Sequence, residues 1–194
     1  MRLGVFGGTF DPPHNGHLAL CLLAREQLGL DRLVISVSKN PFKAPADASD
    51  THRKRMAELL ATEINRTGDF AEVSSWELER SGPSYTVDLL LHLHQERHSS
   101  EFVLLVGEDS YRELPKWKAA ERIPGLCTIV VFMRSDAAPE DAASFGELPP
   151  ALFVDFDMPV SATAVRELLR QGASATHHLP ASIDRYIVAN GLYR

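Results

Sequence analysis

A short apolar run, two glycines and a helical pattern open the chain and restrict its fold. Residues 3–6 read Leu-Gly-Val-Phe, which predicts a buried strand, and Gly7 and Gly8 stop this strand in a tight turn. Apolar residues then recur every three and four positions over residues 17–28, before Gly29, which predicts a helix. A strand, a turn and a helix in this order begin a βαβ unit.

The same alternation continues to the end of the chain. Further strands are predicted over residues 33–37, 70–76, 102–106, 127–133 and 152–156, and further helices over 53–64, 85–96, around Trp117, over 162–170 and over 181–190. Right-handed crossovers then give an α/β, Rossmann-like doubly wound parallel sheet with helices on both faces and a small C-terminal helical segment. Ligands bind such sheets where the strand order reverses, at the carboxyl ends of the strands. We therefore expect the glycine turn and the loop at Gly107 to converge on one crevice.

Length and composition restrict the protein class. A chain of 194 residues fits one domain, over residues 1–194, and residues 134–150 are expected to form a surface excursion rather than a linker. A net charge of −6 argues against nucleic-acid or membrane partners. The first strand leaves no room for a signal peptide, and Cys21 and Cys127 are expected to be buried thiols. We expect a soluble, cytoplasmic, single-domain protein.

The first turn carries the candidate chemistry. Gly7 and Gly8 are expected to adopt positive φ and let a ligand approach the backbone, while Thr9 offers a hydroxyl. A turn that simply requires glycine explains these residues equally well. His14 and His17 change this balance, because two imidazoles three residues apart at a helix N-terminus make a site for an anion. A zinc pair or a covalent histidine nucleophile is the alternative, but no third zinc ligand lies close in the sequence.

Residues 7–17, which end in His-Asn-Gly-His at positions 14–17, resemble the signature of the HxGH nucleotidyltransferase superfamily. Further motifs occur in the order found in the bacterial nicotinate-nucleotide adenylyltransferase family. They are Pro-Ser-Tyr-Thr at 83–86, Gly-Glu-Asp-Ser at 107–110, Leu-Pro-Lys-Trp at 114–117, Val-Ser-Ala-Thr-Ala-Val-Arg at 160–166 and Gly-Leu-Tyr-Arg at 191–194.

This resemblance implies that AMP passes from ATP to nicotinate mononucleotide, giving nicotinate adenine dinucleotide and pyrophosphate. It implies catalytic roles for His14, His17 and Arg166. The residues implied for ATP are Gly7, Gly8, Thr9, Phe10, Lys43, Gly107, Asp109, Ser161 and Thr163, and those for nicotinate mononucleotide are Tyr85, Thr86 and Trp117. Mg²⁺ is expected to enter with ATP, without a named protein ligand, and a homodimer is a family-level expectation.

Elementary chemistry agrees with several of these assignments. Ser161 is a good N-cap, and Arg166 follows one turn later, so that free N–H groups and a guanidinium are expected to grip the β- and γ-phosphates. An indole such as Trp117 can stack on a pyridinium ring, and a helix start at Thr86 can bind the carboxylate of that ring. Lys39 is the alternative to Lys43 as a phosphate ligand.

Two other functions stay open at this point. One is an adenylyltransferase for another acceptor, such as nicotinamide mononucleotide or phosphopantetheine. The other is a nucleotide sensor of the same fold without turnover, although such a sensor does not need His14, His17 and Arg166 together. An aminoacyl-tRNA synthetase is excluded because the chain is too short and too acidic.

Overall fold

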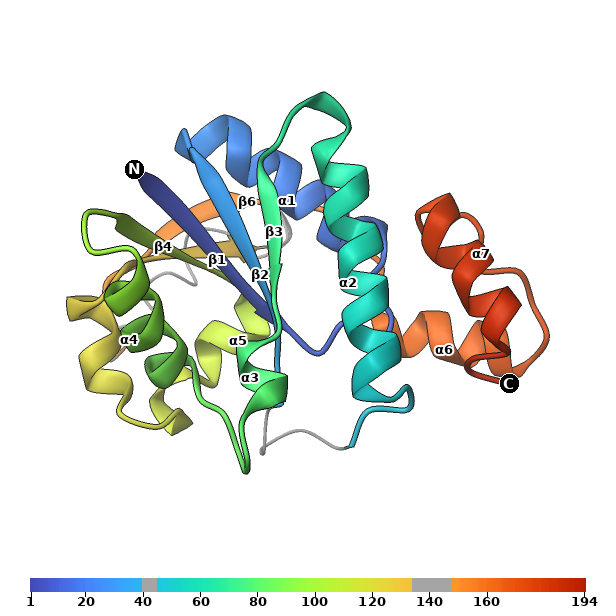
Figure 1. Cartoon of the computed structure of the whole chain (residues 1–194). Helices are drawn as coiled ribbons and strands as arrows, with labels where there is room; N and C mark the ends of the chain where they lie inside the picture. The colour runs from blue at the N-terminus through green and yellow to red at the C-terminus, as the bar shows by residue number, and fades with distance from the viewer. Residues whose placement is uncertain (40–44, 134–147) are drawn as a thin grey trace.

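A six-stranded parallel sheet with the strand order β3-β2-β1-β4-β5-β6 lies at the centre of the molecule (Figure 1). The computed structural model describes residues 1–39, 45–133 and 148–194. The strands are β1 (Arg2–Gly8), β2 (Arg32–Val37), β3 (Ala71–Ser74), β4 (Glu101–Gly107), β5 (Thr128–Met133) and β6 (Leu152–Asp155). The order reverses between β1 and β4, which lie side by side, so the predicted doubly wound α/β fold is confirmed.

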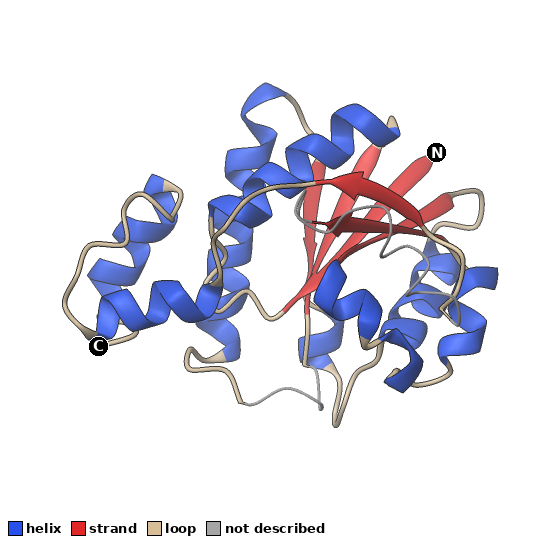
Figure 2. Ribbon diagram, turned by 180° about the vertical axis from the view of Figure 1, so that it is seen from behind, coloured by secondary structure: helices blue, strands red, loops and turns tan. Residues whose placement is uncertain are grey.

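Helices cover both faces of this sheet (Figure 2). The α-helices are α1 (Asn15–Leu28), α2 (Asp50–Ile64), α3 (Trp76–Glu79), α4 (Thr86–Glu96), α5 (Glu108–Arg112), α6 (Ala162–Arg170) and α7 (Ala181–Asn190). The 3₁₀ segments are η1 (Asn65–Thr67), η2 (Leu114–Lys116) and η3 (Ala120–Gly125). None of the helices in the described ranges combines the length and apolar character that crossing a bilayer requires.

The alternation of side chains along the central strands produces two separate cores. On β2, Leu33 and Ile35 face α1 and α2, whereas Val34 faces α4 and the segments η2 and η3. Successive side chains of a strand point to opposite faces, so a strand that is apolar throughout can fill both layers. All of these side chains are almost fully buried.

Three predicted elements differ from the structure. The strand predicted over 70–76 ends at Ser74, because Trp76 begins the short helix α3. The helix expected around Trp117 is a 3₁₀ turn with Pro115 inside it, and Trp117 itself is extended (φ −74°, ψ 150°). Asp109 belongs to helix α5 rather than to a loop. Helices of four or five residues are too short to give a recognisable apolar period, so the sequence pattern could not reveal α3 and α5.

The C-terminal helices α6 and α7 lie beside α2 and away from the sheet (Figure 1). Two hydrogen bonds attach α7 to α2, one from Ser182 Oγ to Glu63 Oε1 at 2.7 Å and one between His52 Nδ1 and Tyr186 Oη at 2.8 Å. A third joins this segment to the start of the chain, since Tyr193 Oη donates to the buried carboxylate of Asp11 at 2.8 Å.

We predict that Tyr193→Phe lowers the free energy of unfolding by about 1–3 kcal/mol, because it leaves a buried carboxylate oxygen with one donor fewer. Urea unfolding at neutral pH measures this loss. Tyr186→Phe is the matched control, since it removes the hydroxyl of a less buried bond to His52, and its effect should be smaller. Equal losses in the two variants would contradict the special role of the Tyr193 bond.

Candidate active site

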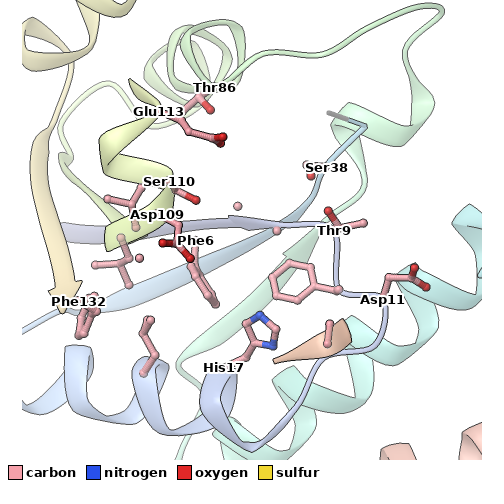
Figure 3. Close-up of a pocket in the computed structure, with 18 of the residues that line it drawn as sticks. Phe6, Thr9, Asp11, His17, Ser38, Thr86, Asp109, Ser110, Glu113 and Phe132 are labelled. Atoms are coloured by element: carbon pink, nitrogen blue, oxygen red, sulfur yellow. The ribbon is translucent and has the colours of Figure 1, made fainter. Parts of the chain in front are cut away.

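A cleft of about 860 Å³ lies at the carboxyl ends of β1 and β4. Figure 3 shows Thr9 and His17 facing a space that Asp109, Ser110 and Glu113 approach from the side of α5. The two segments predicted to converge therefore meet. The cleft is lined by every predicted site residue in the described ranges, namely Gly7, Gly8, Thr9, Phe10, His14, His17, Tyr85, Thr86, Gly107, Asp109, Trp117, Ser161, Thr163 and Arg166. Lys43 lies outside the described residues.

Of the two reasons predicted for the glycines at the end of β1, the positive φ is wrong. Neither Gly7 nor Gly8 has a positive φ, and the left-handed residue of this segment is Phe10, at φ 52°. A Cβ on Gly8 would lie 2.9 Å from the Phe10 ring, so Gly8 makes room for that ring. A Cβ on Gly7 would meet no described atom within 4 Å, which leaves the backbone at Gly7 open to a ligand in the cleft.

His14 and His17 stack on each other at the start of α1, with ring centroids 3.8 Å apart and planes inclined by 28°. The backbone N–H of His14, the N-cap residue, donates to Nδ1 of His17 at 3.1 Å. Because Nδ1 accepts this bond, the neutral His17 ring carries its proton on Nε2. The rings of Phe6 and Phe10 enclose His17, with centroid distances of 5.8 and 5.3 Å. The pair therefore offers a fixed N–H donor beside the helix N-terminus.

Burial keeps His14 uncharged. Its side chain is 7% exposed, and burial followed by the nearby charge of His178 lowers its pKa to about 4. His178 is held close because its carbonyl accepts the backbone N–H of Asn15 at 2.8 Å. The buried Nδ1 of His14 has no hydrogen-bond partner among the described residues. His14 is consequently neutral at pH 7. It can bind an anion through a hydrogen bond, but it does not carry a positive charge.

Gly16 determines the orientation of the His14 ring. A Cβ at this position would lie 2.9 Å from Val160 Cγ1 and 3.0 Å from two atoms of the His14 imidazole. Such distances are too short for a side chain, so any larger residue must displace either the ring or the Val160 segment. The absence of a side chain at Gly16 is thus a packing requirement of the site.

Asp11 and Arg53 hold the glycine segment in place, and sequence reasoning missed both. Asp11 is 5% exposed and accepts the backbone N–H groups of Asp47 and Ala48 at 2.8 and 3.0 Å, in addition to the Tyr193 hydroxyl. Arg53, on α2 and 3% exposed, donates to the carbonyls of Thr9 and Ser38 at 2.8 and 2.9 Å. Asp11 lies inside the signature at residues 7–17 and Tyr193 inside the motif at 191–194, but the sequence assigned no role to either residue.

Glu77 forms a second buried carboxyl group at the cleft wall. It is 4% exposed and accepts the Ser36 hydroxyl at 2.7 Å. Burial raises the pKa of Glu77, while the Ser36 bond opposes this rise. Lys39 turns toward the same wall and donates to the carbonyls of Leu78 and Arg80 at 3.3 and 3.4 Å. Lys39 therefore holds the end of α3 and the residue after it, and it does not line the cleft.

The second predicted clamp is the start of α6. Ser161 caps this helix, because its Oγ accepts the N–H of Ala164 at 3.2 Å, as predicted from the sequence. Arg166 donates to the carbonyl of Asp11 at 2.8 Å and lies 2.6 Å from the Asp47 carboxylate. The guanidinium is thus at the cleft but already paired with an acid, so an incoming anion must compete with Asp47.

The opposite end of the cleft is formed by the start of α4 and the link between η2 and η3. Tyr85 is the N-cap of α4 and Thr86 is its first residue, while Trp117 and Lys118 line the cleft beside them. The four side chains combine an aromatic surface, a hydroxyl and a cation. Trp76 stacks on His92 with ring centroids 4.5 Å apart and has Arg80 over its ring, and it does not line the cleft.

Known proteins resemble this chain over its whole length. The cytidylyltransferase-like family model matches residues 5–168. A probable nicotinate-nucleotide adenylyltransferase of Chlorobaculum tepidum is 58% identical over 100% of this chain and 99% of its own, and one of Chlorobaculum parvum is 56% identical over 100% of both chains. A solved Plasmodium falciparum nicotinic acid mononucleotide adenylyltransferase, complexed with NaAD, has a TM-score of 0.82 at 15% identity and covers 99% of this chain and 97% of its own.

We predict that His14→Gln flattens the pH dependence of stability. Between pH 6.5 and about 4 the unfolded chain binds a proton at His14 that the native state excludes, so the wild type loses stability as the pH falls. The loss attributable to His14 is about 2 kcal/mol between pH 7.5 and pH 5. Urea unfolding of both proteins at these two pH values measures it, and an equal wild-type-minus-variant difference at both would contradict the buried neutral state.

Proposed function

The chain belongs to the cytidylyltransferase-like family, and on this premise we propose that it transfers AMP from ATP to nicotinate mononucleotide. The products are nicotinate adenine dinucleotide and pyrophosphate, and the reaction serves NAD biosynthesis. The observation that carries the proposal is the stacked pair His14 and His17 at the N-terminus of α1, in one cleft with the α6 N-terminus. The relatives that are more than half identical over the full chain bear the name of this activity.

The chemistry is an in-line substitution at the α-phosphorus of ATP. An oxygen of the 5′-phosphate of nicotinate mononucleotide forms the new P–O bond, and the bond from the α-phosphorus to the bridging oxygen breaks. The electron pair of that bond leaves with pyrophosphate. A phosphate monoester is largely dianionic at neutral pH, with a second pKa of about 6, so the attack needs no general base. The protein must supply alignment and charge stabilisation.

His14 and His17 would supply these at the α-phosphate. The Nε2–H of His17 is a donor of fixed direction, since its other nitrogen accepts from the backbone. Because its pKa is lowered to about 4, His14 is neutral at pH 7 and would contribute a hydrogen bond rather than a charge. The N–H groups at the start of α1 add their partial positive charge to the same place.

The β- and γ-phosphates would lie at the start of α6. Ser161, Thr163 and Arg166 are the ligands that we assign there, with Lys43 as a further predicted cation. Arg166 would exchange the Asp47 carboxylate for phosphate oxygens. Gly7, Gly8, Thr9, Phe10, Gly107 and Asp109 are assigned to the nucleotide, the exposed carboxylate of Asp109 as an acceptor for ribose hydroxyls.

The acceptor would lie against Tyr85, Thr86 and Trp117. An indole face beside a pyridinium cation contributes about 0.5–2 kcal/mol, depending on desolvation. The N-terminus of α4 favours an anion, which suits the carboxylate of the nicotinate ring.

Mg²⁺ enters this proposal as part of the MgATP substrate. In the described ranges no group of three or more His, Cys, Asp or Glu side chains is arranged to hold a metal. Asp11, at the phosphate end, already accepts from Asp47, Ala48 and Tyr193. Phosphate oxygens and water would therefore hold the ion, as Mg²⁺ prefers. The single domain, the homodimer, the cytoplasmic location and the absence of nucleic-acid or membrane partners stay predictions.

Pyrophosphate release from MgATP with each mononucleotide in turn tests the function. We expect turnover with nicotinate mononucleotide and weaker turnover with nicotinamide mononucleotide. His14→Ala or His17→Ala should lower kcat by about 10²–10³-fold, the effect of losing one preorganised donor. ATP binding without release with either acceptor would favour the sensor of the same fold, and equal turnover of acid and amide would contradict the assignment of Thr86 and Trp117.

Gly16→Ala tests the placement of His14 separately from its chemistry. The added Cβ must displace the imidazole or the Val160 side chain that packs beside it, so we expect kcat to fall by about tenfold or more, whereas the helix itself gains propensity. Thermal unfolding and pyrophosphate release are measured together. Gly125→Ala is the matched control, since a Cβ there meets no described atom within 4 Å. Full activity of Gly16→Ala would contradict the packing requirement.

A further inference from the structure

We infer that Lys118 determines the preference of the site for an acidic acceptor over its amide. This inference rests on the proposed function and names the cation that recognises the nicotinate carboxylate. Lys118 follows Trp117 directly and lines the cleft together with Tyr85 and Thr86. It stands where the ring of the acceptor is assigned.

Two contacts hold the Lys118 ammonium group near the first turn of α4. Its Nζ lies 3.0 and 3.3 Å from the carboxylate oxygens of Asp88 and 4.7 Å from the centre of the Tyr85 ring. Tyr85 is the N-cap of α4 and Asp88 lies in its first turn, so the ammonium group is beside the helix start to which the substrate carboxylate is assigned. The side chain of Lys118 is 50% exposed and can therefore move toward a ligand.

The distribution of charge in the cleft makes this position unusual. Of the Lys and Arg side chains in the described ranges, only Lys118 and Arg166 line the cleft. Arg166 belongs to the end formed by Ser161 and Thr163, so Lys118 is the cation of the acceptor end. Five carboxylates line the same cleft, namely Asp11, Glu77, Glu108, Asp109 and Glu113.

These carboxylates make the Lys118 charge decisive for selectivity. Asp11 and Glu77 are buried and hydrogen-bonded, and Glu108 pairs with Arg112 at 2.8 Å. Asp109 and Glu113 are exposed, and their charge favours the pyridinium ring but opposes its carboxylate. The amide analogue has the same ring without the negative charge. A cation beside the N-terminus of α4 offsets the repulsion between these acids and the carboxylate, and specificity is the difference between the affinities for acid and amide.

Removing Asp88 distinguishes substrate binding by Lys118 from a purely structural ion pair. If Lys118 only braced α4, removing either partner would have the same effect. If Lys118 binds the substrate, Asp88 competes with the substrate carboxylate for the ammonium group. Loss of Lys118 should then weaken the preference for the acid, whereas loss of Asp88 should leave it intact or strengthen it.

The experiment measures kcat/KM for nicotinate and nicotinamide mononucleotides with saturating MgATP. In Lys118→Gln we expect the acid-to-amide ratio to fall by about fivefold or more, mainly through a higher KM for the acid, as for the loss of one charge-assisted contact at a half-exposed site. Lys118→Arg, which keeps the charge, should retain most of the preference. Asp88→Asn should not lower the ratio. Lys116→Gln is the matched control, because this neighbouring exposed lysine does not line the cleft.

A ratio in Lys118→Gln that falls by less than this amount overturns the inference, as does an equal fall in Asp88→Asn or in Lys116→Gln. These outcomes leave the proposed function intact as long as the wild type turns over nicotinate mononucleotide. Absence of turnover in the wild type removes both. The two failures are therefore distinguishable from the wild-type assay alone.

Discussion

The site depends on the hydrogen bonds that Asp11 accepts. One of its oxygens accepts from Ala48 and Tyr193, the other accepts from Asp47, and the backbone carbonyl of Asp11 accepts from Arg166. Four parts of the chain therefore meet at one buried residue. A buried carboxylate is stable only when hydrogen-bond donors surround it. Separating any of these parts from Asp11 would remove such a bond and destabilise the fold. This requirement fixes the glycine segment, the residues before α2 and the C-terminal helices in one arrangement.

Although the protein is acidic, its cleft can bind anionic ligands because N–H groups and single cations line it. The net charge of −6 repels phosphates at a distance, but it acts little over the few ångströms inside a cleft, where N–H groups and single cations dominate. Neutral His14 fits this arrangement, because it donates without adding charge that the fold would have to stabilise. The two cleft cations, Arg166 and Lys118, lie at opposite ends, and each is paired with an aspartate in the described structure. Each pair restrains a flexible cation before a ligand arrives.

The sequence predicted the sheet well because its strands are continuous apolar runs between glycines and polar turns. It also identified the cleft, because His14, His17 and the Ser161 segment lie at helix starts that follow strands. Asp11, Arg53 and Glu77 were missed, since a single acid or base in a polar loop or a charged helix looks solvated until its distant partners are known. The predicted positive φ at Gly7 and Gly8 was wrong for a related reason. The requirement at Gly8 comes from the Phe10 ring, and local sequence does not reveal where a ring will fold back.

The bond between Tyr193 and Asp11 also has a consequence for the order of folding, because it joins residues 182 positions apart. A chain made from its N-terminus produces β1 and α1 first, yet Asp11 obtains its last donor only when the segment after α7 has docked. Contacts of such long sequence separation form late, since most of the chain must be ordered before the ends can meet. Once β6 has been synthesised, all strands of the sheet are present, whereas the donor Tyr193 is still to come. The arrangement of the glycine segment around Asp11 is therefore complete only when the last residues of the chain are in place.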